Sequence, residues 1–213
     1  MKVGFIPAKA DPEKQASFIE STLKPLMKRA KNGGISLFFA DASHFVMGGF
    51  PGYLWGKARQ FIMTGSGRKR FNVLGALNFA TKKVETVVND TYINAVEVMN
   101  LIDLLISNYQ NIYLVLDNAR YQRCAAVMEY AAKNGVSLIF LPTYSPNLNL
   151  IERIWKFVKS EVLSASYYES FDEFKFAISS CIGKLNTVYS SKINSLISEN
   201  IQTFDYISLR NVA

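Results

Sequence analysis

The chain has 213 residues, with 24 lysines and arginines against 17 aspartates and glutamates, which gives a formal net charge of +7. Its composition of 49% hydrophobic and 19% charged residues excludes a disordered chain, and no apolar run is long enough to cross a membrane. Two cysteines and one histidine exclude a disulfide scaffold, a cysteine-rich zinc site and catalysis by several histidines. We therefore expect a cytoplasmic α/β domain whose basic charge favours a polyanionic partner.

The first predicted element is a helix. Asp11 and Pro12 are a typical helix start, a capping side chain followed by proline at the first helical position. Apolar residues at helical spacing follow, and Pro25 should kink or split this helix. A short apolar strand over residues 35–40 then ends at Asp41.

The rest of the chain alternates strands and helices after a glycine-rich loop. Apolar alternation and short apolar runs predict strands over residues 71–79, 84–88, 112–116 and 136–141. Helical spacing predicts helices over residues 93–106, 121–133 and about 150–162, and a mostly helical tail from residue 171. Early hairpin-like strands followed by strand–helix–strand units predict a mixed sheet with helices on its faces.

Three carboxylates stand at the ends of these elements. Asp41 and Asp117 each follow an apolar strand, and Glu152 lies in the first turn of a helix. Functional groups gather at the carboxyl ends of parallel strands, so the two aspartates lie side by side if their strands are parallel neighbours. Converging carboxylates repel one another unless a cation neutralises them, and hard oxygen ligands suit Mg²⁺ or Mn²⁺. Two such ions could clamp a phosphodiester.

Each carboxylate also has a purely structural interpretation. Asp117 could cap the helix that follows it, with Asn118 sharing that role. Asp41 could simply end its strand. Glu152 could belong to a capping box whose first residue is Asn149. From the residues alone these interpretations stay open.

Four segments resemble the catalytic domain of insertion sequence 630 type transposases, the bacterial branch of the mariner superfamily. They are residues 38–45 (FFADASHF), 66–78 (SGRKRFNVLGALN), 114–122 (LVLDNARYQ) and 141–159 (LPTYSPNLNLIERIWKFVK). The 34 residues between Asp117 and Glu152 match the separation typical of this branch. The resemblance extends over about residues 2–189.

The resemblance implies a ribonuclease-H-like fold, in which a mixed five-stranded sheet has helices on both faces and its first and fourth strands pair in parallel. It implies that Asp41, Asp117 and Glu152 form an acidic catalytic triad that binds two Mg²⁺ ions, with Mn²⁺ as a substitute. The implied activity is cleavage of double-stranded DNA at transposon ends, followed by attack of the freed 3′-hydroxyl on target DNA. The resemblance also implies a homodimer. It implies no association with a membrane and no nucleotide cofactor.

The chain departs from this family in two places. Leu150 stands where the family commonly has proline, a change that should preserve the helix start. The family's N-terminal helix-turn-helix region is missing, so we expect a fragment or a truncated product, divided into a lead-in (1–34), a catalytic core (35–165) and a helical extension (166–213). Two alternatives follow: an idle remnant that binds DNA or regulates a relative, and another ribonuclease-H-like nuclease.

Basic residues are the candidates for contact with DNA phosphates. Arg68, Lys69 and Arg70 start a predicted hairpin, and Lys156 and Lys159 share one face of the Glu152 helix. Each group could equally be a solvated surface.

Two further residues have open interpretations. His44 could assist the site, although a packed structural histidine is the preferred interpretation, and Trp55 could pack on the core, meet DNA or meet a second subunit. The segment 52–57 (GYLWGK) fails as a nucleotide-binding loop because its spacing is one residue short.

Overall fold

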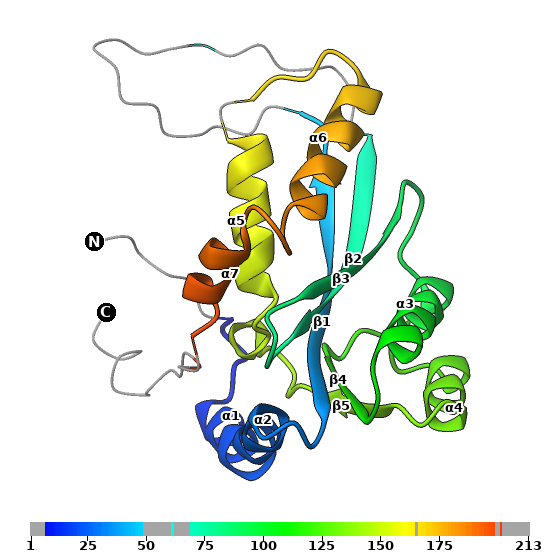
Figure 1. Cartoon of the computed structure of the whole chain (residues 1–213), viewed down its shortest axis with the longest axis vertical. Coiled ribbons are helices and arrows are strands. Elements are labelled where there is room, and N and C mark those ends of the chain that lie inside the picture. Colours follow the sequence, from blue (N-terminus) through cyan, green and yellow to red (C-terminus); the bar gives the residue numbers. More distant parts are fainter. Residues whose placement is uncertain (1–6, 49–60, 62–68, 165, 199–200, 202–213) are drawn as a thin grey trace.

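Five strands form one mixed sheet in a computed structural model that describes residues 7–48, 61, 69–164, 166–198 and 201 (Figure 1). The sheet order is β3-β2-β1-β4-β5. Strands β1 to β3 pair antiparallel, whereas β4 runs parallel to β1 and β5 parallel to β4. The predicted mixed five-stranded sheet is therefore confirmed. The strands are β1 (Ser36–Val46), β2 (Arg70–Asn78), β3 (Val84–Asn89), β4 (Ile112–Leu116) and β5 (Ser137–Phe140).

Helices cover both faces of the sheet, as predicted. One face packs against α3 and α4, and the other against α5 and the helices near the two ends of the described chain (Figure 1). None of the helices in the described ranges is long and apolar enough to cross a membrane. The helices are α1 (Pro12–Phe18), the π-helix η1 (Ile19–Leu23), α2 (Lys24–Lys31), α3 (Ala95–Asn108), α4 (Ala125–Lys133), the 3₁₀-helix η2 (Pro146–Leu148), α5 (Glu152–Leu163), α6 (Phe171–Gly183) and α7 (Ser190–Leu196).

The first helix starts and divides where the sequence predicts. The Asp11 side chain accepts a hydrogen bond from the backbone N–H of Lys14 at 3.1 Å. Pro25 is the second residue of α2 and follows the π-helical turn η1. Proline lacks the N–H that a continuous α-helix needs, so the π-helical turn absorbs the interruption.

Strand alternation divides the core into two apolar clusters. In β1, Leu37 and Phe39 face α5, whereas Phe38 and Ala40 face α3. The same alternation continues in the neighbouring strands, so each face of the sheet has a core of its own. A side chain of β1 therefore faces α5 where its residue number is odd and α3 where it is even.

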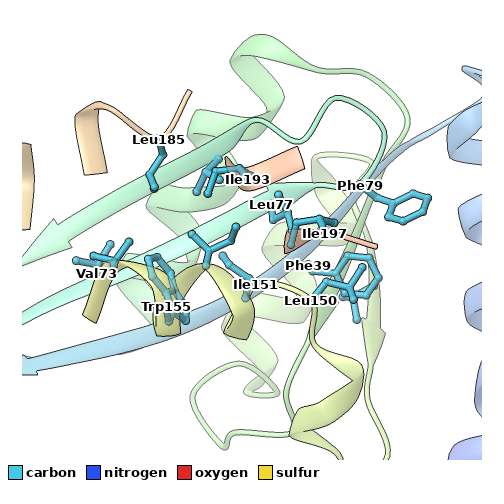
Figure 2. Packing of buried hydrophobic residues seen from close by; sticks show 14 of the residues in the cluster. Phe39, Val73, Leu77, Phe79, Leu150, Ile151, Trp155, Leu185, Ile193 and Ile197 are labelled. Carbon is cyan, nitrogen blue, oxygen red and sulfur yellow. The ribbon is translucent and has the colours of Figure 1, made fainter. Parts of the chain in front are cut away.

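The helix α5 lies very close to the sheet at Gly75 of β2. A Cβ atom at Gly75 would lie 2.7 Å from the ring of Trp155 and 3.1 Å from Ile151, so only glycine fits there. Figure 2 shows Trp155 and Ile151 among the buried side chains that fill this space. The apolar side of α5 is buried, as predicted for Ile151, Ile154, Trp155, Val158 and Val162.

The prediction that the first strand ends at residue 40 was wrong, because β1 continues to Val46. Its second half pairs antiparallel with the start of β2, where Phe45 lies opposite Phe71 and both are buried. Asp41 is therefore inside a strand, not at its end. The predicted glycine-rich loop and Trp55 lie outside the described residues, except for the loop's first glycine, Gly48.

Candidate active site

The end of the β1–β4 pairing brings Asp41 and Asp117 together. The parallel register runs from Ser36 opposite Ile112 to Ala40 opposite Leu116. Asp41 is the next residue of β1, and Asp117 directly follows β4. Alternation puts Asp41 on the same face as Phe39, which is the face that α5 covers. The prediction that these two strands are parallel neighbours, with adjacent aspartates, is confirmed.

Glu152 is the first residue of α5, and the start of this helix lies at the same edge of the sheet. The helix is held there by Trp155, which packs onto Gly75, and Gly75 is the register partner of Asp41 on β2. The side chain of Glu152 lies close enough to Asp41 for its charge and a hydrogen bond to affect the Asp41 pKa. Asp41 is therefore a neighbour of both other predicted carboxylates at this edge of the sheet.

The electrostatics of this edge are unfavourable for three free charges. Burial, and then the negative charges of Asp117 and Glu152, raise the pKa of Asp41 to about 8. Burial also raises the pKa of Asp117, against a hydrogen bond from Asn149 that lowers it. Burial and the charge of Asp41 raise the pKa of Tyr121 to about 12. At neutral pH the edge therefore retains a proton on Asp41 unless a cation replaces it.

The donor set suits a hard divalent cation in its chemistry. Carboxylate oxygens are the ligands that Mg²⁺ and Mn²⁺ prefer, and the repulsion that raises the Asp41 pKa is what such an ion relieves. Across the described ranges, however, no three His, Cys, Asp or Glu side chains already converge on a metal position. Asp41 is the common neighbour of the other two carboxylates, and binding an ion requires that they draw together.

Asn149 is a site residue that sequence reasoning missed. Its side chain is 1% exposed, and its Nδ2 donates to the Ala40 carbonyl at 2.9 Å and to Asp117 Oδ1 at 3.0 Å. The interpretation of Glu152 as part of a capping box with Asn149 was wrong, because α5 has Ile151 at its N-cap and no side-chain cap bond. Leu148 and Leu150 on either side of Asn149 are fully buried, so the amide needs a buried partner.

The interpretation of Asp117 as a helix cap was also wrong. The next helix begins at Ala125 with Cys124 at its N-cap, whereas the sequence predicted a start at residue 121. Backbone turns from Ala119 fill the interval. Asn118 instead donates to the Leu141 carbonyl at 2.8 Å. Asp117 is thus free of the structural role that competed with a catalytic one.

A cavity of about 170 Å³ opens beside Asp117. Its wall includes Asn118 and the segment Leu141–Pro146. Within that segment Tyr144 is half exposed and has a φ of 59°, a left-handed conformation that is unfavourable for an aromatic residue. Asp117 is therefore accessible from this side.

The basic residues predicted to contact DNA lie at two places. Lys69 is exposed and Arg70 opens β2, five register positions from the pair Asp41–Gly75, which is about 17 Å along the strand. Arg68 lies outside the described residues.

Lys156 and Lys159 follow Glu152 by about one and two helical turns of α5. Lys156 is exposed and lines a cavity of about 410 Å³ together with Arg153 and Lys192. Lys159 is half-buried, with Nζ 5.8 Å from the centre of the Phe45 ring.

His44 does not belong to the acidic edge. It alternates onto the opposite face of β1 from Asp41, where Nδ1 lies 2.6 Å from Asn72 Oδ1. The residue is exposed, so the prediction of a packed histidine was wrong in its burial. The hydrogen bond to the buried Asn72 gives His44 a structural partner.

Comparison with known proteins assigns both a family and a fold. Residues 36–175 match the sequence profile described as DDE superfamily endonuclease. No curated protein sequence matches significantly. The catalytic domain of Mos1 mariner transposase is similar in structure, with a TM-score of 0.53, 14% identity and coverage of 94% of this chain and 100% of that one.

Two larger assemblies contain the same fold. The mariner Mos1 paired-end complex with Mg has a TM-score of 0.61 and 15% identity, over 96% of this chain and 68% of that chain. A chain of the simian T-cell lymphotropic virus intasome complex has a TM-score of 0.51 and 12% identity, over 72% and 49%. The predicted ribonuclease-H-like fold, as found in transposase and integrase cores, is confirmed.

Proposed function

Because the chain belongs to the DDE superfamily of endonucleases, we propose that it is the catalytic domain of a cytoplasmic DNA transposase of the insertion sequence 630 type. The observation that carries the proposal is that Asp117 and Glu152 both lie close to Asp41 at one edge of the sheet, where burial and then their negative charges raise the pKa of Asp41 to about 8. Structural packing does not require three acids there, whereas cation-dependent phosphoryl transfer does.

The proposed chemistry has two steps at phosphorus. In the first, water attacks a DNA phosphodiester at a transposon end, the bond from phosphorus to the 3′-oxygen breaks, and the products are a 3′-hydroxyl and a 5′-phosphate. In the second, the 3′-hydroxyl attacks a target phosphodiester and displaces a new 3′-hydroxyl. Each step exchanges one P–O bond for another, so no covalent enzyme intermediate is needed.

The chain's own residues supply position and charge. Asp41, Asp117 and Glu152 would hold two Mg²⁺ ions, with Mn²⁺ as a substitute. When bound, the ions would polarise the phosphodiester and activate the attacking oxygen as a nucleophile. The rigid pairing of β1 with β4 fixes the two aspartates, and the seating of Trp155 on Gly75 fixes the approach of Glu152.

The partner is double-stranded DNA in this proposal. Solved Mos1 complexes are described as paired-end complexes with a transposon end, which supports a homodimer on two DNA ends. Lys156, Lys159 and the basic residues 68–70 are the candidate phosphate contacts. Residues 1–34 would be a lead-in, residues 35–165 the catalytic core and residues 166–213 a helical extension.

Nicking of supercoiled plasmid in Mn²⁺ tests the proposal. The unaltered chain and Glu129→Gln, which removes an exposed charge on α4, should nick DNA, whereas Asp117→Asn should not. Equal nicking by Asp117→Asn and the unaltered chain would show a contaminating nuclease. No nicking by either would favour the idle remnant.

A further inference from the structure

Asn149 connects all three acidic positions at the edge of the sheet. Its Nδ2 donates to the carbonyl of Ala40, the residue before Asp41, and to the Asp117 carboxylate. Its backbone carbonyl accepts from the N–H of Glu152 at 3.2 Å. One residue therefore contacts the backbone beside the first acid, the side chain of the second and the backbone of the third.

The orientation of the Asn149 amide follows from its partners. A backbone carbonyl can only accept a hydrogen bond, so the nitrogen and not the oxygen of the amide must face Ala40. The same nitrogen carries a second hydrogen, which is directed to Asp117 Oδ1. A carboxylate that accepts a hydrogen bond from a fixed donor is restricted in rotation. Residues that bind metal ligands commonly orient those ligands in this way.

Fold stability alone does not explain this amide. Asn149 Oδ1 is buried with no hydrogen-bond partner within the described part of the chain, and a buried polar atom without a partner costs free energy. Leu148, Leu150 and Ile151 around it are fully buried apolar residues. An apolar residue at position 149 would remove the unpaired oxygen, at the loss of the two hydrogen bonds to the acidic edge.

We propose that Asn149 is a positioning residue, which orients Asp117 and fixes the start of α5 so that the three carboxylates can hold a divalent cation together. The inference rests on the proposed function, because it concerns the same site. It adds that the geometry of the site is set from the segment before α5 and not by the strands alone.

Asn147 is a matched control in the same segment. It precedes Asn149 by two residues and is half-buried, and its Nδ2 donates to Gln15 Oε1 of α1 at 3.0 Å. This hydrogen bond connects Asn147 to the N-terminal helix. Asn147→Leu and Asn149→Leu replace the same amide by the same apolar side chain at neighbouring places.

Calorimetric titration of the whole chain with Mn²⁺ tests the inference, alongside thermal unfolding in EDTA. Asn149→Leu should bind Mn²⁺ about 10- to 100-fold more weakly, as for other partners of metal ligands. Asn147→Leu should stay within about twofold of the unaltered chain. If Asn149→Leu fails to fold, Asn149→Ser, which is too short to reach both acceptors, should show the same loss.

Failure of the positioning role can be distinguished from failure of the proposed function. If the unaltered chain binds Mn²⁺ and a folded Asn149 variant binds it within about twofold as tightly, or if Asn147→Leu loses as much affinity, the positioning role is overturned while the proposed function stands. If the unaltered chain binds no Mn²⁺ and nicks no DNA, the proposed function fails, and the role of Asn149 fails with it.

Discussion

The two faces of the sheet make different use of the same strands. On the α3 face, Phe38 and Ala40 of β1 and Leu116 of β4 are apolar up to the last paired residue, and all are buried. On the α5 face, Leu37 and Phe39 are followed by Asp41, and the next residue on that face is Ser43, whose buried Oγ has no partner in the described structure. At the carboxyl end of the β1–β4 pairing, the α3 face is apolar, whereas the α5 face holds polar groups. The polar pair His44 and Asn72 on the α3 face lies further along β1.

The difference indicates where stability is given up for function. Burying carboxylates close together is unfavourable, and the raised pKa of Asp41 reflects that cost. The face with α3 has no comparable cost in its apolar cluster. Substitutions on the α3 face should therefore change stability, and substitutions at the acidic edge should change activity.

The largest expected effect is at Glu152. Glu152→Gln should reduce Mn²⁺-dependent plasmid nicking to the level of a sample without protein, because it removes one of three cation ligands while keeping the shape of the side chain. Glu161→Gln, on an exposed position of the same helix, should nick normally. Nicking by Glu152→Gln at the rate of Glu161→Gln would remove Glu152 from the site.

On the opposite face, Ile102→Ala should act on stability alone. Ile102 is fully buried in α3, so the truncation should lower the free energy of unfolding by about 2–5 kcal/mol, measured by urea denaturation. Nicking per folded molecule should stay close to that of the unaltered chain. A loss of nicking in the folded variant would show that the two faces are not independent.

Gly75→Ala should affect both properties, since Gly75 lies opposite Asp41 and beneath α5. Its new Cβ would overlap the Trp155 ring, which should cost about 1–3 kcal/mol and displace Glu152. Gly183→Ala, where a Cβ meets nothing within 4 Å, is the control and should be neutral or slightly stabilising. Urea denaturation measures the effect on stability, and plasmid nicking measures the effect on activity. Normal nicking by Gly75→Ala would show that activity does not depend on the close approach of α5 to β2.

The smallest expected effect is the pH dependence of Asp41→Asn. Burial and the neighbouring charges raise the pKa of folded Asp41 to about 8, whereas in the unfolded chain its pKa is near the ordinary value of 3.8. The folded state thus binds more protons between these values, and raising the pH across this window destabilises it. In EDTA, Asp41→Asn should therefore raise the thermal midpoint more at pH 8 than at pH 5, whereas an equal shift at both pH values would contradict the raised pKa.

Most elements were predictable because they depend on local signals. Apolar runs identified β4, and a capping aspartate with proline identified the start of α1. The end of β1 was not predictable from residues 35–46 alone. Asp41 interrupts the apolar run, and only pairing with β2, more than twenty residues later, extends the strand to Val46.

The acids of the proposed site stand out in the sequence, whereas the residue proposed to connect them does not. Asp41, Asp117 and Glu152 stand out because acids next to apolar runs are unusual, and the family resemblance supplied the parallel pairing. Asn149 has the sequence context of a helix cap, and its role depends on distant partners at Ala40 and Asp117. Side-chain contacts across more than thirty residues follow from the tertiary fold and not from local pattern.

Anomalous diffraction from crystals of this chain soaked in Mn²⁺ tests the central claim most directly. We predict manganese peaks bounded by the carboxylates of Asp41, Asp117 and Glu152, with the three side chains closer together than in the metal-free chain. The claim would be contradicted if this edge of the sheet held no manganese at a concentration that supports DNA nicking.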